Sequence, residues 1–473
     1  MNDEIKKKMR SIPGMDILLA QDWSLPWQEE LGRETVKRHF NADLTQIRRK
    51  LLEGEIEDVS MDALRLLLEK NLELERRFRL RPVINATGVV IHTNLGRSLL
   101  AEEALVAVMR VGSSYNTLEY DLEAGARGQR NSHVEGALCA LTGAEAALVV
   151  NNNAGAVLLC LSALAQGTEV VVSRGELVEI GGSFRVPDIM KFSGAELVEV
   201  GTTNRTHLRD YSEGITERAS MLLKVHPSNF RMEGFTAAPE REELAALAHE
   251  RGLIFMEDAG SGLLIEGQLL GLSGETDVRT CLEAGADVVT FSGDKMLGGP
   301  QLGIIVGKKR VIDRLKRHQV LRALRVDKMT LAAFEATLRL YAKGDYDKIP
   351  TLAMLRRSSE DMKVQARRLA SKLRTVTSAS ITVLEVEDAV GGGSSPALPL
   401  PGFGVAVSSH PAGGAGTLQA FFRSLDLPLI CGARENSLVL HVRTLSRADE
   451  AAICNAFELL EQEKPEKEAP GHV

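Results

Sequence analysis

The amino-acid sequence predicts an α/β protein with a mainly parallel seven-stranded sheet and helices on both faces. A helical domain is expected before the sheet and a small α+β domain after it. Three patterns in the 473 residues lead to this expectation. Residues 1–80 place apolar side chains at helical spacing, residues 81–335 alternate β-branched runs with helical stretches, and residues 336–473 surround a Gly-, Ser- and Pro-rich stretch with short strands. These ranges are the predicted domains.

The N-terminal range is expected to form amphipathic helices. Apolar side chains from Val36 to Leu51 recur at steps of three and four residues, so they share one helix face, and Gly54 ends the helix. A second helix is expected to begin near Ser60. Residues 1–81 hold 16 acidic and 16 basic side chains, and this neutral balance suits either a plain helical bundle or an appended recognition module.

The central range contains seven short candidate strands rich in β-branched residues, with helical stretches between them. They are residues 146–150, 169–172, 196–200, 220–225, 253–256, 288–291 and 302–306. Strands separated by helices indicate βαβ units and therefore a mainly parallel sheet. Helices then lead to about residue 375. Strands at 381–386, 403–408 and 437–442 with a helix at 448–460 complete the predicted C-terminal domain.

Composition and charge limit the function classes. The chain carries 57 Lys+Arg against 64 Asp+Glu, a net charge of −7, which argues against a generic polyanion binder but leaves room for a local basic surface. Aromatic residues make up 4%, too few for a protein that reads nucleic acid by stacking bases. Five cysteines without C-x-x-C spacing suit reduced thiols, and no apolar run reaches the roughly 18 residues of a membrane span. We therefore expect a cytoplasmic protein with no membrane partner.

Asp258 and Lys295 carry the first chemical signal, because each follows a predicted strand. In open α/β sheets ligands bind beyond the carboxyl ends of the strands, so both side chains should face one crevice. A lysine and a carboxylate in this arrangement suit pyridoxal phosphate. The lysine forms a Schiff base with that cofactor, and the acid keeps the pyridine nitrogen protonated. Either residue alone would more often be an ordinary surface charge.

Residues 151–156, Asn-Asn-Asn-Ala-Gly-Ala, join the strand 146–150 to a helix expected over 157–165. Small residues at a helix start let a ligand approach the backbone, and free N–H groups with the helix dipole bind an anion. On its own this run would be read as an ordinary helix cap. Beside Asp258 and Lys295 it predicts the binding site of the cofactor phosphate.

Arginines in loops are further candidates. Arg97, Arg127 and Arg130 lie in glycine-containing loops, whereas Arg322 and Arg325, three residues apart, are expected on one helix face. Arginine suits bidentate contact with phosphate or carboxylate, although each of these alone is as well explained as a surface charge. His and Cys residues show no metal-ligand spacing, so no metal site is predicted.

Longer motifs resemble one enzyme family. They are RPVINATG at residues 81–88, HTNLGR at 92–97, NNNA at 151–154, FSGDKMLGGPQ at 291–301 and HVRT at 441–444. In these runs, and over nearly the whole chain, the sequence resembles the bacterial selenocysteine synthases, which are L-seryl-tRNA(Sec) selenium transferases.

The resemblance implies a fold-type I, pyridoxal-phosphate-dependent transferase. It identifies Lys295 as the Schiff-base lysine and assigns Asp294 and Arg130 to catalysis, with Arg127 as the open alternative to Arg130. Two sets complete the predicted site. The cofactor-binding set is Lys295, Asp258, Asn152, Asn153, Ala154, Gly155, Asn229 and Ser292, and the set for the phosphate of the selenium donor is Arg97, Arg322 and Arg325.

The reaction implied by the resemblance converts seryl-tRNA(Sec) to selenocysteinyl-tRNA(Sec) with selenophosphate. Water is eliminated to give a dehydroalanyl intermediate, and selenium is then added. The family binds tRNA through its N-terminal domain and assembles as a ring of five dimers, so a homodecamer is expected. Two alternatives remain: a pyridoxal-phosphate-dependent lyase acting on a small amino acid or amino-sugar acid, and a non-catalytic RNA-binding protein on the same fold. Residues 1–80 favour the tRNA enzyme, because the lyase relatives lack them.

Overall fold

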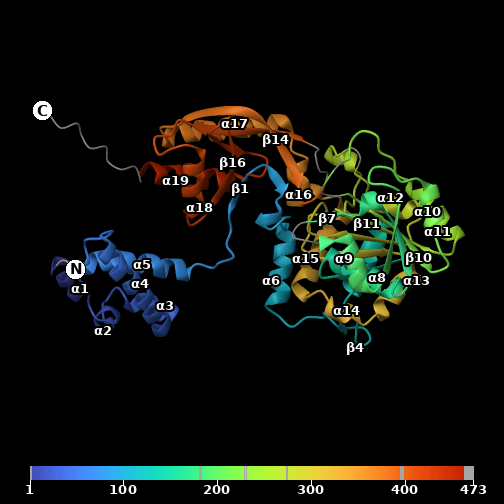
Figure 1. Cartoon of the computed structure of the whole chain (residues 1–473), viewed down its shortest axis with the longest axis horizontal. Helices are drawn as coiled ribbons and strands as arrows, with labels where there is room; N and C mark the ends of the chain where they lie inside the picture. Colours follow the sequence, from blue (N-terminus) through green and yellow to red (C-terminus); the bar gives the residue numbers. More distant parts are fainter. Residues whose placement is uncertain are drawn as a thin grey trace. The chain divides into compact units, whose positions relative to one another are not determined.

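The computed structural model describes residues 3–180, 184–227, 230, 232–272, 275–394 and 399–462 (Figure 1). The chain divides into two compact units, Met1–Pro82 and Val83–Val473. Across the described ranges, no helix combines the length and the apolar character that crossing a membrane requires. The same ranges contain no cluster of His, Cys, Asp and Glu side chains that could hold a metal ion. The predicted domain limits at residues 80 and 335 stay predictions.

The first unit is helical. Its core is built on α4, whose apolar positions from Val36 to Leu51 are buried on the predicted face. Gly54 ends α4 in the left-handed conformation (φ 76°), and Ser60 caps α5 by accepting a hydrogen bond from Ala63 N. The helices are α1 (Asp3–Ser11), α2 (Met15–Leu19), α3 (Leu25–Leu31), α4 (Arg33–Glu53) and α5 (Met61–Arg76).

The second unit contains the predicted seven-stranded sheet, in the order β5-β13-β12-β11-β10-β6-β9. Only β13 runs antiparallel to its two neighbours. All seven candidate strands are present, and the one clear difference is β11, which continues to Gly260. It does so because its acidic residues Glu257 and Asp258 find buried polar partners. The strands are β5 (Ala146–Val150), β6 (Glu169–Ser173), β9 (Glu196–Val200), β10 (Ala219–Val225), β11 (Ile254–Gly260), β12 (Val288–Ser292) and β13 (Gly303–Gly307).

Helices cover both faces of this sheet (Figure 1). Alternate residues of β5 point to opposite sides: Ala147 and Val149 belong to one core, and Leu148 and Val150 to the other. The first core packs against α6 (Glu102–Gly112), α7 (Ser132–Thr142), α11 (Arg241–Glu250), α12 (Val278–Glu283) and α15 (Lys328–Lys343). The second packs against α8 (Asn153–Leu164), α9 (Val186–Ser193) and α13 (Lys309–Arg317).

A six-stranded sheet forms the rest of the second unit, in the order β1-β16-β17-β15-β14-β2. Its edge strands β1 and β2 come from the start of the unit, far along the chain from the others. Three-residue strands carry no periodicity, so the sequence did not indicate this pairing. The strands are β1 (Ile84–Ala86), β2 (Val89–Ile91), β14 (Ser380–Gly391), β15 (Leu400–Ser408), β16 (Leu429–Arg434) and β17 (Ser437–His441). The covering helices are α17 (Ser359–Val376), α18 (Ala415–Ser424) and α19 (Arg447–Gln462).

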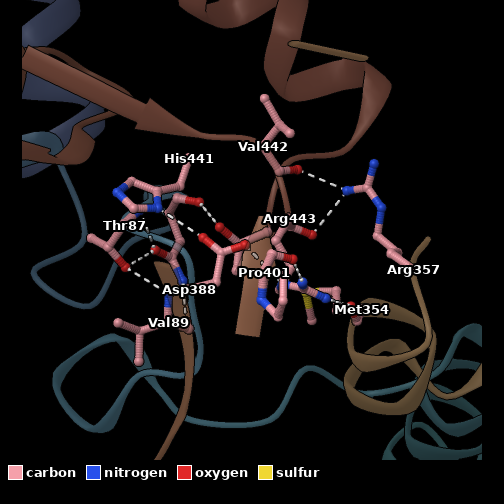
Figure 2. Close-up of polar contacts among 11 residues, drawn as sticks. Thr87, Val89, Met354, Arg357, Asp388, Pro401, His441, Val442 and Arg443 are labelled. Atoms are coloured by element: carbon pink, nitrogen blue, oxygen red, sulfur yellow. Dashed lines mark hydrogen bonds and ion pairs between the residues drawn. The ribbon is translucent and has the colours of Figure 1, made fainter. Parts of the chain in front are cut away.

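A buried ion cluster lies beside the turn between β1 and β2 (Figure 2). The Asp388 carboxylate accepts hydrogen bonds from His441 Nδ1 at 2.7 Å and from Arg443 Nε at 2.8 Å. Arg443 also donates to the backbone oxygens of Met354 and Pro401. Gly88, in the β1–β2 turn, lies so close that a Cβ there would overlap the carboxylate. The cluster therefore fixes the turn from which the chain leads into residues 92–98.

Candidate active site

Lys295 lies in the turn after β12, and its side chain is buried. The residue is 6% exposed, and its amine makes no hydrogen bond or ion pair within the described part of the chain. Burial lowers the pKa of the Lys295 amine. The charge of Arg97 adds to this effect, while Asp258 and Asp294 oppose it. A buried amine that loses its proton readily suits attack on a carbonyl carbon.

Asp258 lies near the end of the neighbouring strand β11 and is also buried. Its Oδ1 accepts hydrogen bonds from Asn153 Nδ2 (2.9 Å), Gly260 N (3.2 Å) and Thr290 Oγ1 (3.2 Å). Burial raises the pKa of the Asp258 carboxyl, although these hydrogen bonds and the nearby Lys295 lower it. Oδ2 receives no hydrogen bond from the described residues, so it can accept one from a ligand.

The Asn-rich run forms the turn into α8, which begins at Asn153, four residues earlier than predicted. Asn152 caps the helix, and its Oδ1 accepts a hydrogen bond from Gly155 N at 2.7 Å. Asn153 Oδ1 is buried, and none of the described residues donates a hydrogen bond to it. A Cβ at Gly155 would come within 3.0 Å of Asn151 Oδ1 and 3.1 Å of Leu324, so glycine keeps this turn open.

These features fit pyridoxal phosphate. The first turn of α8, which includes Ala154, offers backbone N–H groups and the positive end of a helix dipole to a phosphate. The orphaned Asn153 Oδ1 is a buried acceptor that a ligand donor can satisfy. Asp258 supplies a carboxylate for a ring nitrogen, and Lys295 supplies the amine. Ser292 is buried at the end of β12, three residues before Lys295.

Residues 92–98 bring Arg97 to the Lys295 turn. Arg97 Nη1 donates to Asp294 Oδ2 at 2.8 Å, and Ser98 Oγ donates to the backbone oxygens of Asp294 (2.9 Å) and Lys295 (2.7 Å). Arg97 has a φ of 63°, a left-handed conformation uncommon outside glycine. Strain of this kind persists where the surroundings enforce it, often at functional sites. The predicted donor-binding Arg97 and the predicted catalytic Asp294 are thus an ion pair beside the lysine.

Glu119 gathers three other arginines. Arg130 Nη2 donates to Glu119 Oε1 at 2.8 Å, and Arg127 Nη2 donates to Oε2 at 3.1 Å. Arg325 Nη1 lies 3.7 Å from Oε1. The hydrogen bond from Arg130, with the charges of all three arginines, lowers the pKa of the Glu119 carboxyl. Glu119 lies outside every motif recognised in the sequence, so only the folded chain reveals it.

These arginines line an open cavity of about 560 Å³, together with Lys309, Lys316 and Arg317 of α13. Arg130 Nε is buried there and has no hydrogen-bond partner among the described residues. The cavity adjoins the Asn-rich turn into α8, which we call the cofactor turn. Leu324 O accepts a hydrogen bond from Asn151 N of this turn at 3.0 Å, and Arg325 is the next residue. The structure therefore places Arg97 and the Glu119-bound arginines in two separate groups.

Arg322 is exposed on α14 (Val320–Ala323), and because that helix ends before Arg325, the expectation of one shared helix face is wrong. Asn229 lies outside the described residues. His226, which is described, donates its backbone N–H to Asp258 O at 3.0 Å and therefore borders the site.

Comparison with known proteins identifies the family. The family model for L-seryl-tRNA selenium transferase matches residues 83–446. The chain belongs to this family. It is 46% identical over 458 residues to an L-seryl-tRNA(Sec) selenium transferase of Clostridium botulinum, covering 96% of this chain and 99% of that one. A protein of the same name from Clostridium perfringens is 46% identical over 456 residues, covering 96% and 98%.

A solved structure supports the architecture. D-glucosaminate-6-phosphate ammonia-lyase superposes with a TM-score of 0.58 at 21% identity, covering 81% of this chain and 96% of that one. At this identity the likeness concerns the fold alone. The predicted fold-type I architecture, with its seven-stranded sheet between two helical layers, is confirmed.

Proposed function

We propose that this protein converts L-seryl-tRNA(Sec) to L-selenocysteinyl-tRNA(Sec) with selenophosphate as the selenium donor and pyridoxal phosphate as cofactor. One observation carries the proposal: a buried Lys295 amine that has no hydrogen-bond partner among the described residues and lies beside the buried Asp258 carboxylate, in a chain whose family is that of the selenium transferases. The ammonia-lyase shares only the fold, so the lyase alternative is not favoured.

Lys295, Asp258 and the α8 turn divide the work of cofactor binding. The N-terminus of α8 would hold the phosphate, Asp258 would keep the ring nitrogen protonated, and Lys295 would bind the carbonyl carbon. When bound, pyridoxal phosphate withdraws electrons from the α-carbon of the seryl group, which makes the α-proton acidic. Once the seryl α-amine has displaced it from that carbon, the Lys295 amine, whose pKa burial lowers, would take up that proton at Nζ.

Loss of the α-proton and of the β-hydroxyl removes one molecule of water from the seryl group. Selenium from selenophosphate then adds to the β-carbon and a proton returns to the α-carbon, while water cleaves the Se–P bond and phosphate is released. Arg97 is placed to bind the donor phosphate, since its guanidinium lies beside Lys295, and Asp294 orients it through the 2.8 Å ion pair. Arg130 and Arg325, around Glu119, supply further cations for the same anionic substrates.

We assign recognition of the tRNA body to residues 1–80. The helical unit is compact and neutral, and the L-seryl-tRNA(Sec) selenium transferase of Clostridium botulinum matches the chain over 96% of its length, so the match extends into this region. Shape and local charge, and not overall charge, would then select the RNA.

We further propose a homo-oligomer, with a decamer of five dimers as the expected form. Exposed apolar side chains gather on α6 and the following loop: Leu105, Val106, Met109, Tyr115, Tyr120 and Leu122. An apolar surface of this kind usually marks a protein interface. Native mass spectrometry tests the assembly, and a monomeric protein would contradict it.

The five cysteines are free, which suits the reducing cytoplasm.

The decisive assay supplies the reconstituted protein with selenophosphate and one aminoacyl-tRNA at a time. Seryl-tRNA(Sec) should be converted to selenocysteinyl-tRNA, whereas ordinary seryl-tRNA should remain. Equal conversion of both would contradict the recognition role of residues 1–80. Release of ammonia from D-glucosaminate 6-phosphate, without conversion of seryl-tRNA(Sec), would favour the lyase.

A further inference from the structure

Helix α13 concentrates positive charge in an otherwise acidic protein. Residues 308–317 contain six cationic side chains and one acidic one, in a chain of net charge −7. The apolar residues Val311, Ile312 and Leu315 are buried against the sheet, so the helix spacing turns the cations outward. We call these cations the basic ridge: Lys308, Lys309, Arg310, Arg314, Lys316 and Arg317.

Carboxylates neutralise part of the ridge. Lys308 and Arg310 contact the buried Asp287 at 2.7 and 3.2 Å, Lys309 contacts Asp313 at 3.0 Å, and Lys316 contacts Glu135 at 2.7 Å. Glu145 also accepts a hydrogen bond from the backbone N–H of Lys309. These carboxylates hold the cations in place but do not cancel the charge of the ridge.

Two arginines of the ridge form no ion pair with a carboxylate of the described residues, although Asp313 lies near enough to Arg317 to be affected by its charge. Arg314 donates only to the backbone oxygen of Ala163, at 3.1 Å, and Arg317 makes no hydrogen bond or ion pair with any described residue. Because they lie three residues apart on one helix, their side chains are neighbours. Both are exposed, so their charge faces solvent.

Cavities flank the ridge on two sides. Lys309, Lys316 and Arg317 line the cavity that also holds Arg130 and Arg325. Lys308, Arg310 and Arg314 line a second cavity of about 660 Å³. This cavity lies where β10 and β11 begin, whereas Asp258 lies near the other end of β11. Its described lining includes His249 and no carboxylate, with Asp287 buried beneath. The ridge thus links the arginine cavity beside the cofactor turn to a positive surface well away from it.

We infer that the basic ridge binds the phosphate backbone of the tRNA substrate and leads its aminoacylated arm toward the arginine cavity. This inference rests on the proposed function. An extended row of cations between two open hollows suits a run of phosphates better than one small anion. The ridge supplies the local basic surface that an acidic protein needs to hold RNA.

Binding of uncharged tRNA(Sec) to the cofactor-loaded full chain tests the inference. Affinity is measured by fluorescence anisotropy over a series of salt concentrations for the wild type and for Arg314→Gln/Arg317→Gln. Each lost phosphate contact lowers the slope of log affinity against log salt by about one, so the double variant should lose about two. Its affinity should fall on the order of tenfold at ~0.1 M salt. Visible absorbance of the bound cofactor confirms that the variant is folded.

Two control variants sharpen the test. Arg314→Lys/Arg317→Lys keeps both charges and should keep the slope. Arg209→Gln removes an arginine that is 77% exposed on α10 (Leu208–Gly214), away from the ridge, and should leave the slope unchanged. A wild-type slope in the Gln double variant, or an equal loss in Arg209→Gln, would overturn the inference.

Inorganic phosphate serves as the small-anion probe. If it binds in a manner that depends on Arg314 and Arg317 while tRNA binding does not, the ridge is a small-anion site and the inference fails. The two proposals fail separately. A wild-type protein that never converts seryl-tRNA(Sec) contradicts the proposed function, whereas one that converts it with an unchanged slope in the double variant contradicts only the ridge.

Discussion

Replacing Asp388 by asparagine tests the ion cluster that holds the β1–β2 turn. The Asp388 side chain is fully buried and that of Arg443 is 3% exposed, so the change leaves a buried guanidinium without its counter-charge. In the native cluster both Asp388 oxygens accept hydrogen bonds, one from His441 and one from Arg443. In the asparagine variant one of these oxygens becomes an NH₂ group, so a donor faces a donor. Removing one partner of a buried pair costs about 3–5 kcal/mol.

The size of the second unit converts this energy into a temperature. At about 2.1 cal/mol/K per residue, the roughly 390 residues of Val83–Val473 unfold with an entropy of about 0.8 kcal/mol/K. The midpoint of unfolding should therefore fall by about 4–6 °C in scanning calorimetry at a fixed scan rate. The exposed pair Glu335–Arg339 gives the control, because Glu335→Gln removes about 0.3–0.5 kcal/mol and should shift the midpoint by under about 1 °C. Equal shifts for both variants would refute the reasoning.

Three further predictions concern the site. Gly155→Val should weaken binding of pyridoxal phosphate by at least about tenfold in an equilibrium titration, because the added side chain fills the turn at the start of α8; unchanged binding would contradict the phosphate assignment. Arg97→Gln should raise KM for selenophosphate by about 10- to 100-fold, the worth of one charge-assisted hydrogen bond, while KM for seryl-tRNA(Sec) stays constant. In the cofactor-free protein, Lys295 should react with an aldehyde reagent with a midpoint below the ordinary lysine pKa of 10.5, because burial disfavours its charged form. A midpoint at or above that value, read by peptide mass spectrometry, would argue against the buried amine.

Strand and helix patterns in the sequence predicted the central sheet well, because each strand buries both faces and reads as a short β-branched run. The end of α4 at Gly54 and the start of α5 near Ser60 were also predicted correctly. The end of β11 was placed too early, since the sequence cannot show that Asp258 would be satisfied by Asn153 and Thr290 from other elements.

The candidate site was predicted unevenly for a related reason. Asp258, Lys295 and the α8 turn each follow a strand, and parallel strands bring their carboxyl ends together, so their meeting could be deduced. The pairing of Arg97 with Asp294 spans 197 residues, and the role of Glu119 depends on loops without periodicity. Contacts of this kind depend on tertiary structure alone.

Formation of selenocysteine by the isolated protein tests the central claim most directly. Wild-type protein and Lys295→Ala are each incubated with pyridoxal phosphate, seryl-tRNA(Sec) and selenophosphate. The ester is then hydrolysed, and the released amino acid is identified by mass spectrometry. The wild type should release selenocysteine and Lys295→Ala only serine. Selenocysteine at equal yield from both proteins would contradict the assignment of Lys295 as the Schiff-base lysine. No selenocysteine from the wild type would contradict the proposed selenium transfer.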